Sequence, residues 1–293
     1  DWRTPQRRDY TRKLADILSQ LLPEGVSGSI STVPGSYGRW VQSEEDVEAM
    51  CLMLCDVLMH LRRLRTRTGR DICLALEPEP DCFVETTEQV IEFLTGPMQR
   101  AAREFFKLQA GLEDEQADEI LQRHLGVCFD CAHQAVQFED LSRCLLQLRS
   151  SGVRIAKVHL SAAFEAAPSP EARKQLETFV EPVYLHQTKV ERPGGEIVAY
   201  SDLPDALAGE DPQGRWRVHF HVPLFFESDG ALGSTRRLLK GQFAQLLKSG
   251  FAEHLEIETY TFGVLPDNMA ITDPADAIAR EYQWVLGDLL ALR

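Results

Sequence analysis

Short strand-forming runs alternate with amphipathic helical patterns along most of this 293-residue chain. The β-rich runs cover residues 27–33, 72–77, 126–130, 153–160, 217–223 and 255–260. The helical patterns cover about 8–22, 44–65, 87–108, 139–150, 235–248 and 274–290. Alternation of this kind is typical of βα units around a mainly parallel sheet. The sequence therefore predicts an α/β fold.

Two of the helix starts carry local signals. Thr86 is followed three residues later by Gln89, which indicates a capping box, and Asp273 precedes Pro274, which indicates an N-cap with proline in the first turn. One stretch, residues 162–216, interrupts the alternation and contains a helical pattern at 171–179 and two strand patterns on either side of residues 193–195. Such a long connection is usually a lid or a binding loop, and a surface subdomain without a role in function is the alternative.

Charge and composition exclude several classes of protein. The chain has 31 Lys+Arg against 45 Asp+Glu, for a net charge of −14, whereas non-specific nucleic-acid binding needs a basic surface. No apolar run approaches the roughly 18 residues of a membrane span. Seven cysteines in a chain of this length are typical of reduced thiols, so we expect a cytoplasmic protein.

Ionisable residues stand at the ends of five successive strand patterns. They are Glu77, Asp130 with His133 three residues later, His159, the pair His219 and His221, and Glu258. Each alone is more often a helix cap or a core histidine. Together they would place many charges at one edge of a sheet, which is costly unless a cation or a polar ligand gathers them.

These residues predict a divalent-metal site, with a structural ion-pair network as the alternative. The carboxyl ends of parallel strands are where α/β proteins build their sites. His219 and His221 lie two residues apart on a strand, so they share a face and can serve one ion. Glu256 shares a face with Glu258 and is the alternative ligand there. The pair Cys128 and Cys131 is expected on opposite faces of a strand, and no second pair completes a zinc ribbon.

The series Glu77, Asp130-x-x-His133, His159 and Glu258 resembles the strand-end ligands of xylose isomerase-like TIM barrels. Across essentially the whole chain, the sequence resembles the EboE family of metabolite traffic proteins. The segments that carry this resemblance are SISTVPGSY, LALEPEPDCFVET, VCFDCAHQAV, KVHLSAA, VYLHQTKVE, HFHVPLFFE and LEIETYTFGVLP.

The resemblance implies a (β/α)8 TIM barrel of the xylose isomerase-like type, with residues 1–293 as one domain. The patterns at 27–33, 72–77, 126–130, 153–160 and 255–260 become its fourth to eighth strands. Residues 162–216 become an insertion or lid after the seventh strand, and 217–223 returns as part of that insertion. The family has earlier strands, so we expect this chain to be truncated at its N-terminus, with the edge of strand 27–33 exposed and prone to association.

The resemblance also implies roles for single residues. Glu77, Asp130, His159 and Glu258 would hold one divalent ion, and the mixed carboxylate and imidazole donors suit manganese, zinc, cobalt or iron. Glu77 and Glu258 would act as catalytic base and acid. Substrate oxygens would be bound by the histidines His133, His186, His219 and His221.

The first functional hypothesis is metal-dependent isomerisation or epimerisation of a small polyhydroxy or hydroxycarbonyl metabolite through an enediolate. The second is a protein that binds and passes on a metabolite without turnover, together with other proteins of a metabolite-export pathway. The third is phosphoester hydrolysis like that of endonuclease IV, which requires His133, His219 and His221 to hold metal, with His219 where that enzyme has an Asp. One bound ion would favour the first two, and two or more would favour the third.

Overall fold

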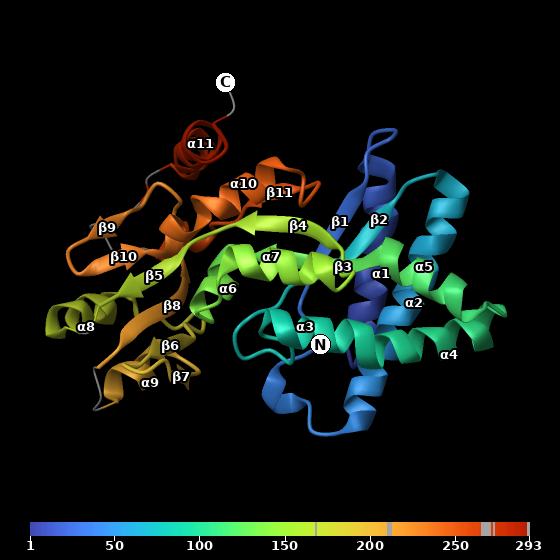
Figure 1. Ribbon diagram of the computed structural model, residues 1–293, viewed down its shortest axis with the longest axis horizontal. Helices are drawn as coiled ribbons and strands as arrows, with labels where there is room; N and C mark the ends of the chain where they lie inside the picture. Colours follow the sequence, from blue (N-terminus) through green and yellow to red (C-terminus); the bar gives the residue numbers. More distant parts are fainter. Residues whose placement is uncertain (168, 210–212, 265–270, 272, 292–293) are drawn as a thin grey trace. The chain divides into compact units, whose positions relative to one another are not determined.

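The computed structural model describes residues 1–167, 169–209, 213–264, 271 and 273–291 (Figure 1). Its contacts divide the chain into two compact units. The first consists of Asp1–Phe129, Cys144–Val158 and Ala252–His254. The second consists of Asp130–Arg143, His159–Phe251 and Leu255–Arg293. The prediction of one domain with 162–216 as an insertion stays a prediction.

A five-stranded sheet has the order β1-β2-β3-β4-β11, and its strands are labelled in Figure 1. These strands are β1 (Gly28–Thr32), β2 (Ile72–Leu76), β3 (Leu125–Asp130), β4 (Ile155–Leu160) and β11 (Leu255–Ile257). The pairs β1–β2 and β2–β3 are parallel, with Ile30 opposite Leu74 and Leu74 opposite Leu125. All five strands lie where the sequence predicted barrel strands, and the predicted α/β class is confirmed.

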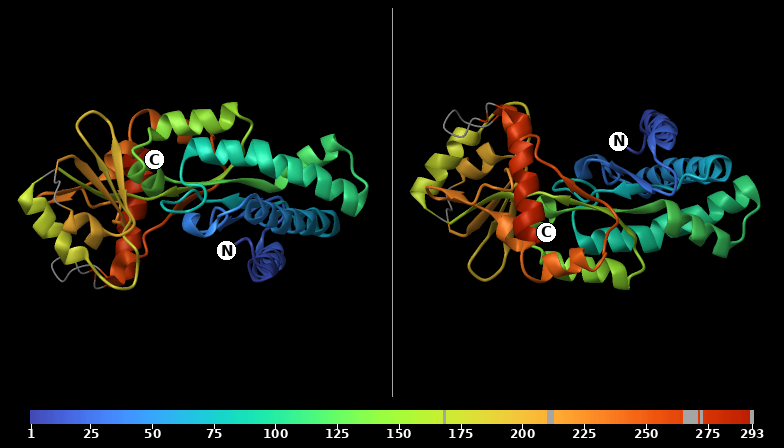
Figure 2. Two further views of the ribbon diagram at one scale, coloured as in Figure 1. Left: turned by 90° about the horizontal axis from the view of Figure 1, so that it is seen from below. Right: turned by 90° about the horizontal axis from the view of Figure 1, so that it is seen from above.

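The first unit surrounds its strands with long amphipathic helices. α1 (Pro5–Leu21) contacts α2 (Glu44–Thr68) and β1, and both views in Figure 2 show α1 (dark blue) beside α2 (blue). The Ser43 hydroxyl caps α2 by accepting from the Asp46 N–H, and Gly69 ends the helix in the left-handed conformation at φ 72°. Every residue of β2 is buried, as expected for a strand covered on both faces.

The predicted helix at 87–108 is correct in extent and interrupted in its middle. It consists of α3 (Thr87–Phe93), a π-helical turn (η2, Leu94–Met98) and α4 (Gln99–Ala110). Pro97 lies in the turn, because proline has no N–H for the regular ladder. The capping box at Thr86 is present as predicted. α5 (Asp114–His124) was not predicted, because its polar composition conceals its helical period.

The second unit contains a six-stranded sheet of order β7-β6-β8-β5-β10-β9. Its strands are β5 (Ala163–Ala166), β6 (Thr188–Glu191), β7 (Ile197–Tyr200), β8 (Arg215–His221), β9 (Ser228–Asp229) and β10 (Leu232–Ser234). The pairs β6–β7, β6–β8, β5–β8, β5–β10 and β9–β10 are antiparallel. The pair β6–β7 is the hairpin that the two strand patterns predicted. The predicted strand 217–223 is β8, which lies outside the five-stranded sheet as expected. The short strands β5, β9 and β10 were not predicted.

Helices and short turns connect the strands of this unit. They are α6 (Cys131–Val136), α7 (Leu141–Ser150), which the two units share, α8 (Pro170–Leu176), η3 (Glu177–Phe179), α9 (Leu203–Ala208), η4 (Thr235–Leu239), α10 (Gln242–Lys248), η5 (Thr261–Val264), α11 (Pro274–Gln283) and η7 (Trp284–Leu289). The continuous helix predicted at 235–248 is wrong, because Gly241 at φ 66° separates η4 from α10. Asp273 caps α11 as predicted.

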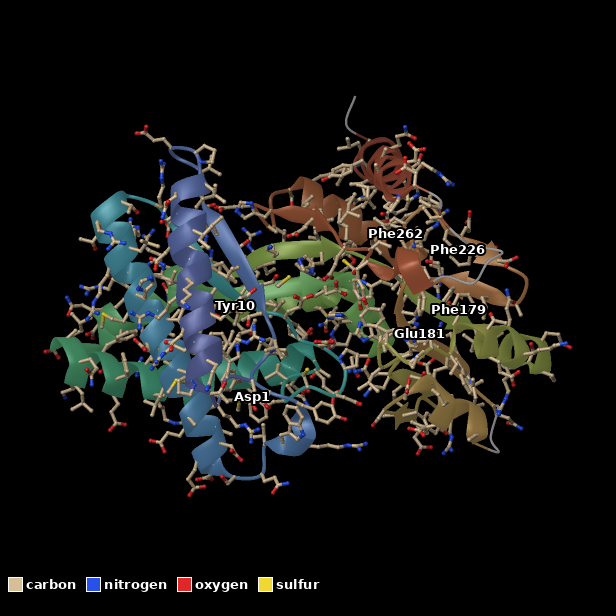
Figure 3. The ribbon with its side chains drawn as sticks, turned by 180° about the vertical axis from the view of Figure 1, so that it is seen from behind. Asp1, Tyr10, Phe179, Glu181, Phe226 and Phe262 are labelled. Atoms are coloured by element: carbon tan, nitrogen blue, oxygen red, sulfur yellow. The ribbon has the colours of Figure 1, made fainter. Side chains whose placement is uncertain are left out.

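An aromatic cluster forms part of the second unit's interior. Phe164 of β5 contacts the rings of Phe179, Phe220 and Phe226 at centroid distances of 4.5, 5.3 and 5.8 Å. Figure 3 labels Phe179 and Phe226 in this region. The cluster includes a residue of β8, because Phe220 lies between His219 and His221 on that strand. It therefore fixes the strand that carries two of the predicted site residues.

Two further observations concern the cysteines and the possibility of a membrane-spanning helix. None of the seven cysteines, all in the described part of the chain, forms a disulfide. Cys131 begins α6 rather than continuing the strand that holds Cys128, contrary to the expectation for that pair. Among the described helices, none is long and apolar enough to cross a membrane.

Candidate metal centre

Asp130 is the last residue of β3 and is completely buried. Its carboxylate caps α6 by accepting from the His133 N–H at 2.8 Å, and it accepts from the Ser161 hydroxyl at 2.9 Å. Because the strand ends directly at the helix cap, no loop residue separates the two elements, and the carboxylate is held in one position. Asp130 thus offers a fixed anionic oxygen inside the second unit.

His159 and Glu258 meet Asp130 within the same unit. The Glu258 Oε2 atom lies 2.9 Å from His159 Nδ1, and the Asp130 Oδ2 atom lies 3.6 Å from the same nitrogen. One ligand atom from each of the three residues lies within 4.8 Å of the others. We call these three residues the carboxylate cluster. Two carboxylates and an imidazole at this spacing form a donor set for a divalent cation, with ligand distances near 2.0–2.2 Å.

Glu256, the alternative to Glu258, faces the other nitrogen of the same imidazole. Its Oε2 atom lies 3.5 Å from His159 Nε2, and its side chain is 55% exposed, against 31% for Glu258. Glu258 is therefore on the side of the ring where Asp130 lies. A carboxylate behind a ligating histidine is a common way to orient the ring, and this is the arrangement that Glu256 has.

A second group of side chains gathers next to this cluster. His133 of α6 and the pair His219 and His221 of β8 are at most 5% exposed, and one ring nitrogen of each lies within 4.8 Å of the others. The His133 ring is 4.6 Å from that of His219 and 5.4 Å from that of His221. We call these residues the histidine cluster. As predicted, the two histidines of β8 share a face.

Hydrogen bonds fix the protonation of two of these rings. His221 Nδ1 donates to the Glu258 carbonyl oxygen at 3.0 Å, and His219 Nδ1 donates to Gln187 Oε1 at 2.8 Å. Because these oxygens accept, each Nδ1 carries a proton, and in the neutral tautomer the lone pair lies on Nε2. Both Nε2 atoms are buried and have no hydrogen-bond partner among the described residues.

The electrostatics follow from burial and from mutual proximity. Burial opposes the charge on Asp130, but the nearby imidazoles of His133, His221 and His159 outweigh this effect and hold its pKa well below the usual range. Burial, together with the neighbouring rings of His133 and His221, holds the pKa of His219 well below 6.5. Asp130 is therefore an anion and His219 a neutral ring, the forms that ligate metals.

His186, predicted as a substrate ligand, uses both ring nitrogens within the protein. Its Nδ1 atom lies 3.3 Å from the His219 carbonyl oxygen, and its Nε2 atom lies 3.1 Å from Glu181 Oε1. Glu181, labelled in Figure 3, also accepts from the N–H groups of Val183 and Tyr184. A substrate contact from His186 would require that one of these bonds be given up.

Glu77 belongs to the first unit, where it directly follows β2. Its N–H donates to the Thr32 carbonyl oxygen at 3.0 Å, which extends the pairing of β1 and β2 by one residue. Its roles as metal ligand and as catalytic base stay predictions.

Two side chains that hold candidate ligands in place were not predicted from the sequence. Ser161 donates to Asp130 and accepts from the Ala132 N–H at 2.9 Å, and Gln187 orients His219. Ser161 had a usable signal, because it lies two residues after His159 in line with the same strand. Nothing local marks Gln187, which reaches His219 across 32 residues of sequence.

Comparisons with known proteins add two solved structures. No protein-family model and no curated protein matches the chain. The chain is similar over 96% of its length to 71% of the probable 3-DHS dehydratase AsbF of petrobactin synthesis from Bacillus anthracis, with 14% identity and a TM-score of 0.47. It is also similar over 96% of its length to 69% of the IOLI protein, which was solved with a bound zinc atom, with 13% identity and a TM-score of 0.43.

Proposed function

We propose that this chain is a metal-dependent enzyme that isomerises or epimerises a small polyhydroxy or hydroxycarbonyl metabolite. The observation that carries the proposal is the carboxylate cluster, in which Asp130, His159 and Glu258 bring ligand atoms within 4.8 Å of one another. The donor set fits a divalent ion of the manganese, iron, cobalt or zinc kind, because it mixes carboxylate oxygens with an imidazole nitrogen.

The chemistry of the cluster suits proton transfer next to a carbonyl group. A bound divalent cation supplies a Lewis acid that polarises a carbonyl oxygen. Within the chain, Glu258 offers a carboxylate that accepts or returns a proton, and Glu77 is the proposed second member of the acid–base pair. Asp130 and Ser161 hold the position of the site through their hydrogen bond.

Deuterium exchange tests this proposal directly. The metal-loaded chain is incubated in D2O with a panel of ketoses, aldoses and hydroxyaldehydes, and NMR follows deuterium at the carbon next to the carbonyl. We expect exchange with at least one substrate, and its loss in His159→Ala and in Glu258→Gln. If metal binds and a metabolite raises the melting temperature without any exchange, the chain is a carrier, as the EboE resemblance suggests.

A second candidate, phosphoester hydrolysis, is favoured by one observation, the histidine cluster beside the carboxylate cluster. Neighbouring metal sites support hydrolysis of phosphate esters by stabilising the attacking and leaving oxygens. The net charge of −14 favours a small phosphorylated metabolite over nucleic acid. Turnover of p-nitrophenyl phosphate or its diester that is lost in both His159→Ala and His221→Ala would select the hydrolase over the isomerase.

A further inference from the structure

Glu281 of α11 carries a buried carboxyl group that belongs to neither of the two clusters. The residue is completely buried. Its Oε1 atom accepts two hydrogen bonds, from the Thr259 hydroxyl at 2.6 Å and from the Leu224 N–H at 2.9 Å. Its Oε2 atom is buried without a hydrogen-bond partner among the described residues. Burial raises the pKa of Glu281 above 4.5 and outweighs the opposing effect of the two hydrogen bonds.

Such a carboxyl group is unfavourable for stability, because a polar oxygen buried without a partner destabilises the folded chain. The other buried residues of α11 and η7 are apolar, namely Ala277, Trp284, Val285 and Leu289. Packing alone would be served by an apolar side chain at position 281 as well. The two groups that donate to Glu281 therefore indicate what the carboxyl group does.

The two donors belong to the two segments that end at the candidate site. Thr259 directly follows Glu258 of the carboxylate cluster, and Leu224 lies three residues after His221 of β8. The segments are also joined directly, because His221 Nδ1 donates to the Glu258 carbonyl oxygen at 3.0 Å. One oxygen of Glu281 therefore binds both segments and closes a ring of hydrogen bonds beside Glu258.

Glu258 has less support from its own strand than the other carboxylate of the cluster. Asp130 is a strand residue and a helix cap, and its side chain is 0% exposed. Glu258 lies one residue beyond the three-residue strand β11, and its side chain is 31% exposed. Its N–H reaches the Leu160 carbonyl oxygen at 3.4 Å, which is long for a hydrogen bond. The position of Glu258 therefore depends on how the segment 258–261 is held.

We propose that Glu281 is a positioning residue, which holds the segment 258–261 against the end of β8 so that Glu258 lies at the carboxylate cluster. This inference rests on the proposed function, because the role of Glu258 as a metal ligand belongs to it. Glu281 acts as a hydrogen-bond acceptor and contacts neither the ion nor the substrate. The amide oxygen of glutamine can accept the same two hydrogen bonds, whereas an apolar side chain cannot.

Co²⁺ binding to the full chain tests this role. The ion of the carboxylate cluster is identified as the one that His159→Ala loses, and calorimetry and visible absorption follow it. We expect Glu281→Leu to weaken its affinity about 10-fold, at the low end of the loss typical of an orienting neighbour, and to shift the Co²⁺ absorption, which reports ligand geometry. Glu281→Gln should match the wild type in both measurements.

Thr259 offers a matched pair of variants on the donor side. Thr259→Val keeps the shape of the side chain without its hydroxyl, and should also weaken Co²⁺ binding. Thr259→Ser keeps the hydroxyl and should retain the affinity of the wild type. In the Glu281→Leu background, Thr259→Val should have no further effect, because the hydrogen bond is already absent.

Val285→Ala is the control for a general loosening of the helix. Val285 is buried one helical turn after Glu281, so its truncation should lower stability and leave Co²⁺ affinity unchanged. An equal loss of affinity in Val285→Ala and Glu281→Leu would overturn the positioning role. So would a Glu281→Gln variant that binds as weakly as Glu281→Leu, or a Thr259→Val variant that binds as tightly as the wild type.

Hydrogen exchange of the metal-free chain separates this inference from the proposed function. The Glu258 N–H should exchange about 10-fold faster in Glu281→Leu than in the wild type and in Glu281→Gln, because the segment 258–261 opens more often. If His159→Ala leaves Co²⁺ binding unchanged, the carboxylate cluster holds no metal and the proposed function fails. The exchange rates then decide the positioning role, and equal rates in the three proteins would overturn it.

Discussion

The two units bury different kinds of side chain. In the described part of the first unit, the buried residues of the acidic and basic types (Asp, Glu, His, Lys and Arg) are His124 and Lys157. In that of the second they are Asp130, His133, His159, His186, Lys189, Arg217, His219, His221, Arg236 and Glu281. The first unit pairs its remaining charges at the surface, as in the bond between Arg103 and Asp118 at 2.6 Å. The first unit therefore buries few acidic or basic side chains, whereas the second unit buries many of them beside its apolar core.

This difference separates stability from chemistry. Each Å² of apolar surface buried in the first unit contributes about 25 cal/mol to folding. In the second unit, buried charges and the Nε2 atoms of His219 and His221, which have no hydrogen-bond partner among the described residues, cost free energy unless a partner or ligand compensates them. We therefore expect substitutions in the first unit to change stability, and substitutions around the two clusters to change ligand binding.

The largest expected effect is on stability. Leu74→Ala removes a completely buried side chain from β2, which lies between β1 and β3 in the sheet. It should destabilise the first unit by about 2–5 kcal/mol through lost burial and the cavity left behind. The free energy of unfolding is measured by urea unfolding followed by hydrogen exchange. The metal content per folded molecule should not change. Reduced metal content in the folded fraction would contradict the comparison.

His159→Ala should have the opposite result, a loss of metal binding rather than of stability. It removes a ligand of the carboxylate cluster, and we expect affinity for the ion at that cluster to fall by more than about 100-fold, beyond the 10–100-fold typical of an orienting neighbour. Calorimetric titration measures the change. Cys131→Ser, at another buried residue of the second unit, is the control that should keep tight binding. A shared loss in both variants would point to misfolding instead.

Two serine-to-alanine substitutions, one in each unit, compare the two units through a smaller change in metal binding. Ser161→Ala removes the hydroxyl that donates to Asp130, and should weaken metal binding about 10–100-fold by freeing the carboxylate. Ser36→Ala removes a hydroxyl of the first unit that is buried without a hydrogen-bond partner among the described residues. It should leave metal binding unchanged and stability unchanged or raised. Equal metal affinity in the two variants would deny Ser161 a role in the site.

The smallest effect is a pH dependence of the first unit. Burial holds the pKa of His124 below 6.5, against a weaker effect of its hydrogen bond to the Ile72 carbonyl oxygen. The unfolded chain therefore binds the proton more readily. The contribution of neutral His124 is full above about pH 6.5 and is lost as the pH falls toward the lowered folded pKa. Between pH 7.5 and 5.5, His124→Gln should lose less stability than the wild type in urea unfolding; an identical loss would refute the assignment.

Much of the fold was predictable because its signals are local. β2 is an apolar run that Glu77 follows directly, and β3 is one that ends at Asp130. The caps at Thr86 and Asp273 depend on residues three or fewer positions away. The errors arose where local pattern is weak. The π-helical turn around Pro97 keeps a helical pattern, and β5 has four residues that gain their pairing from the distant strand β8.

The candidate site also combines features with local sequence signals and features that depend on distant contacts. From the residues alone one could predict that Asp130, His159 and Glu258 lie at or next to strand ends, and that His219 and His221 share one face, because strand alternation is a short-range pattern. That their strands are neighbours was implied only by the resemblance. The fold was needed to show which nitrogen of the His219 and His221 rings faces the cluster, and that Gln187 and the Glu258 carbonyl oxygen select it. Those facts depend on contacts between segments far apart in the chain, where hydrogen-bond partners are chosen by packing and not by spacing.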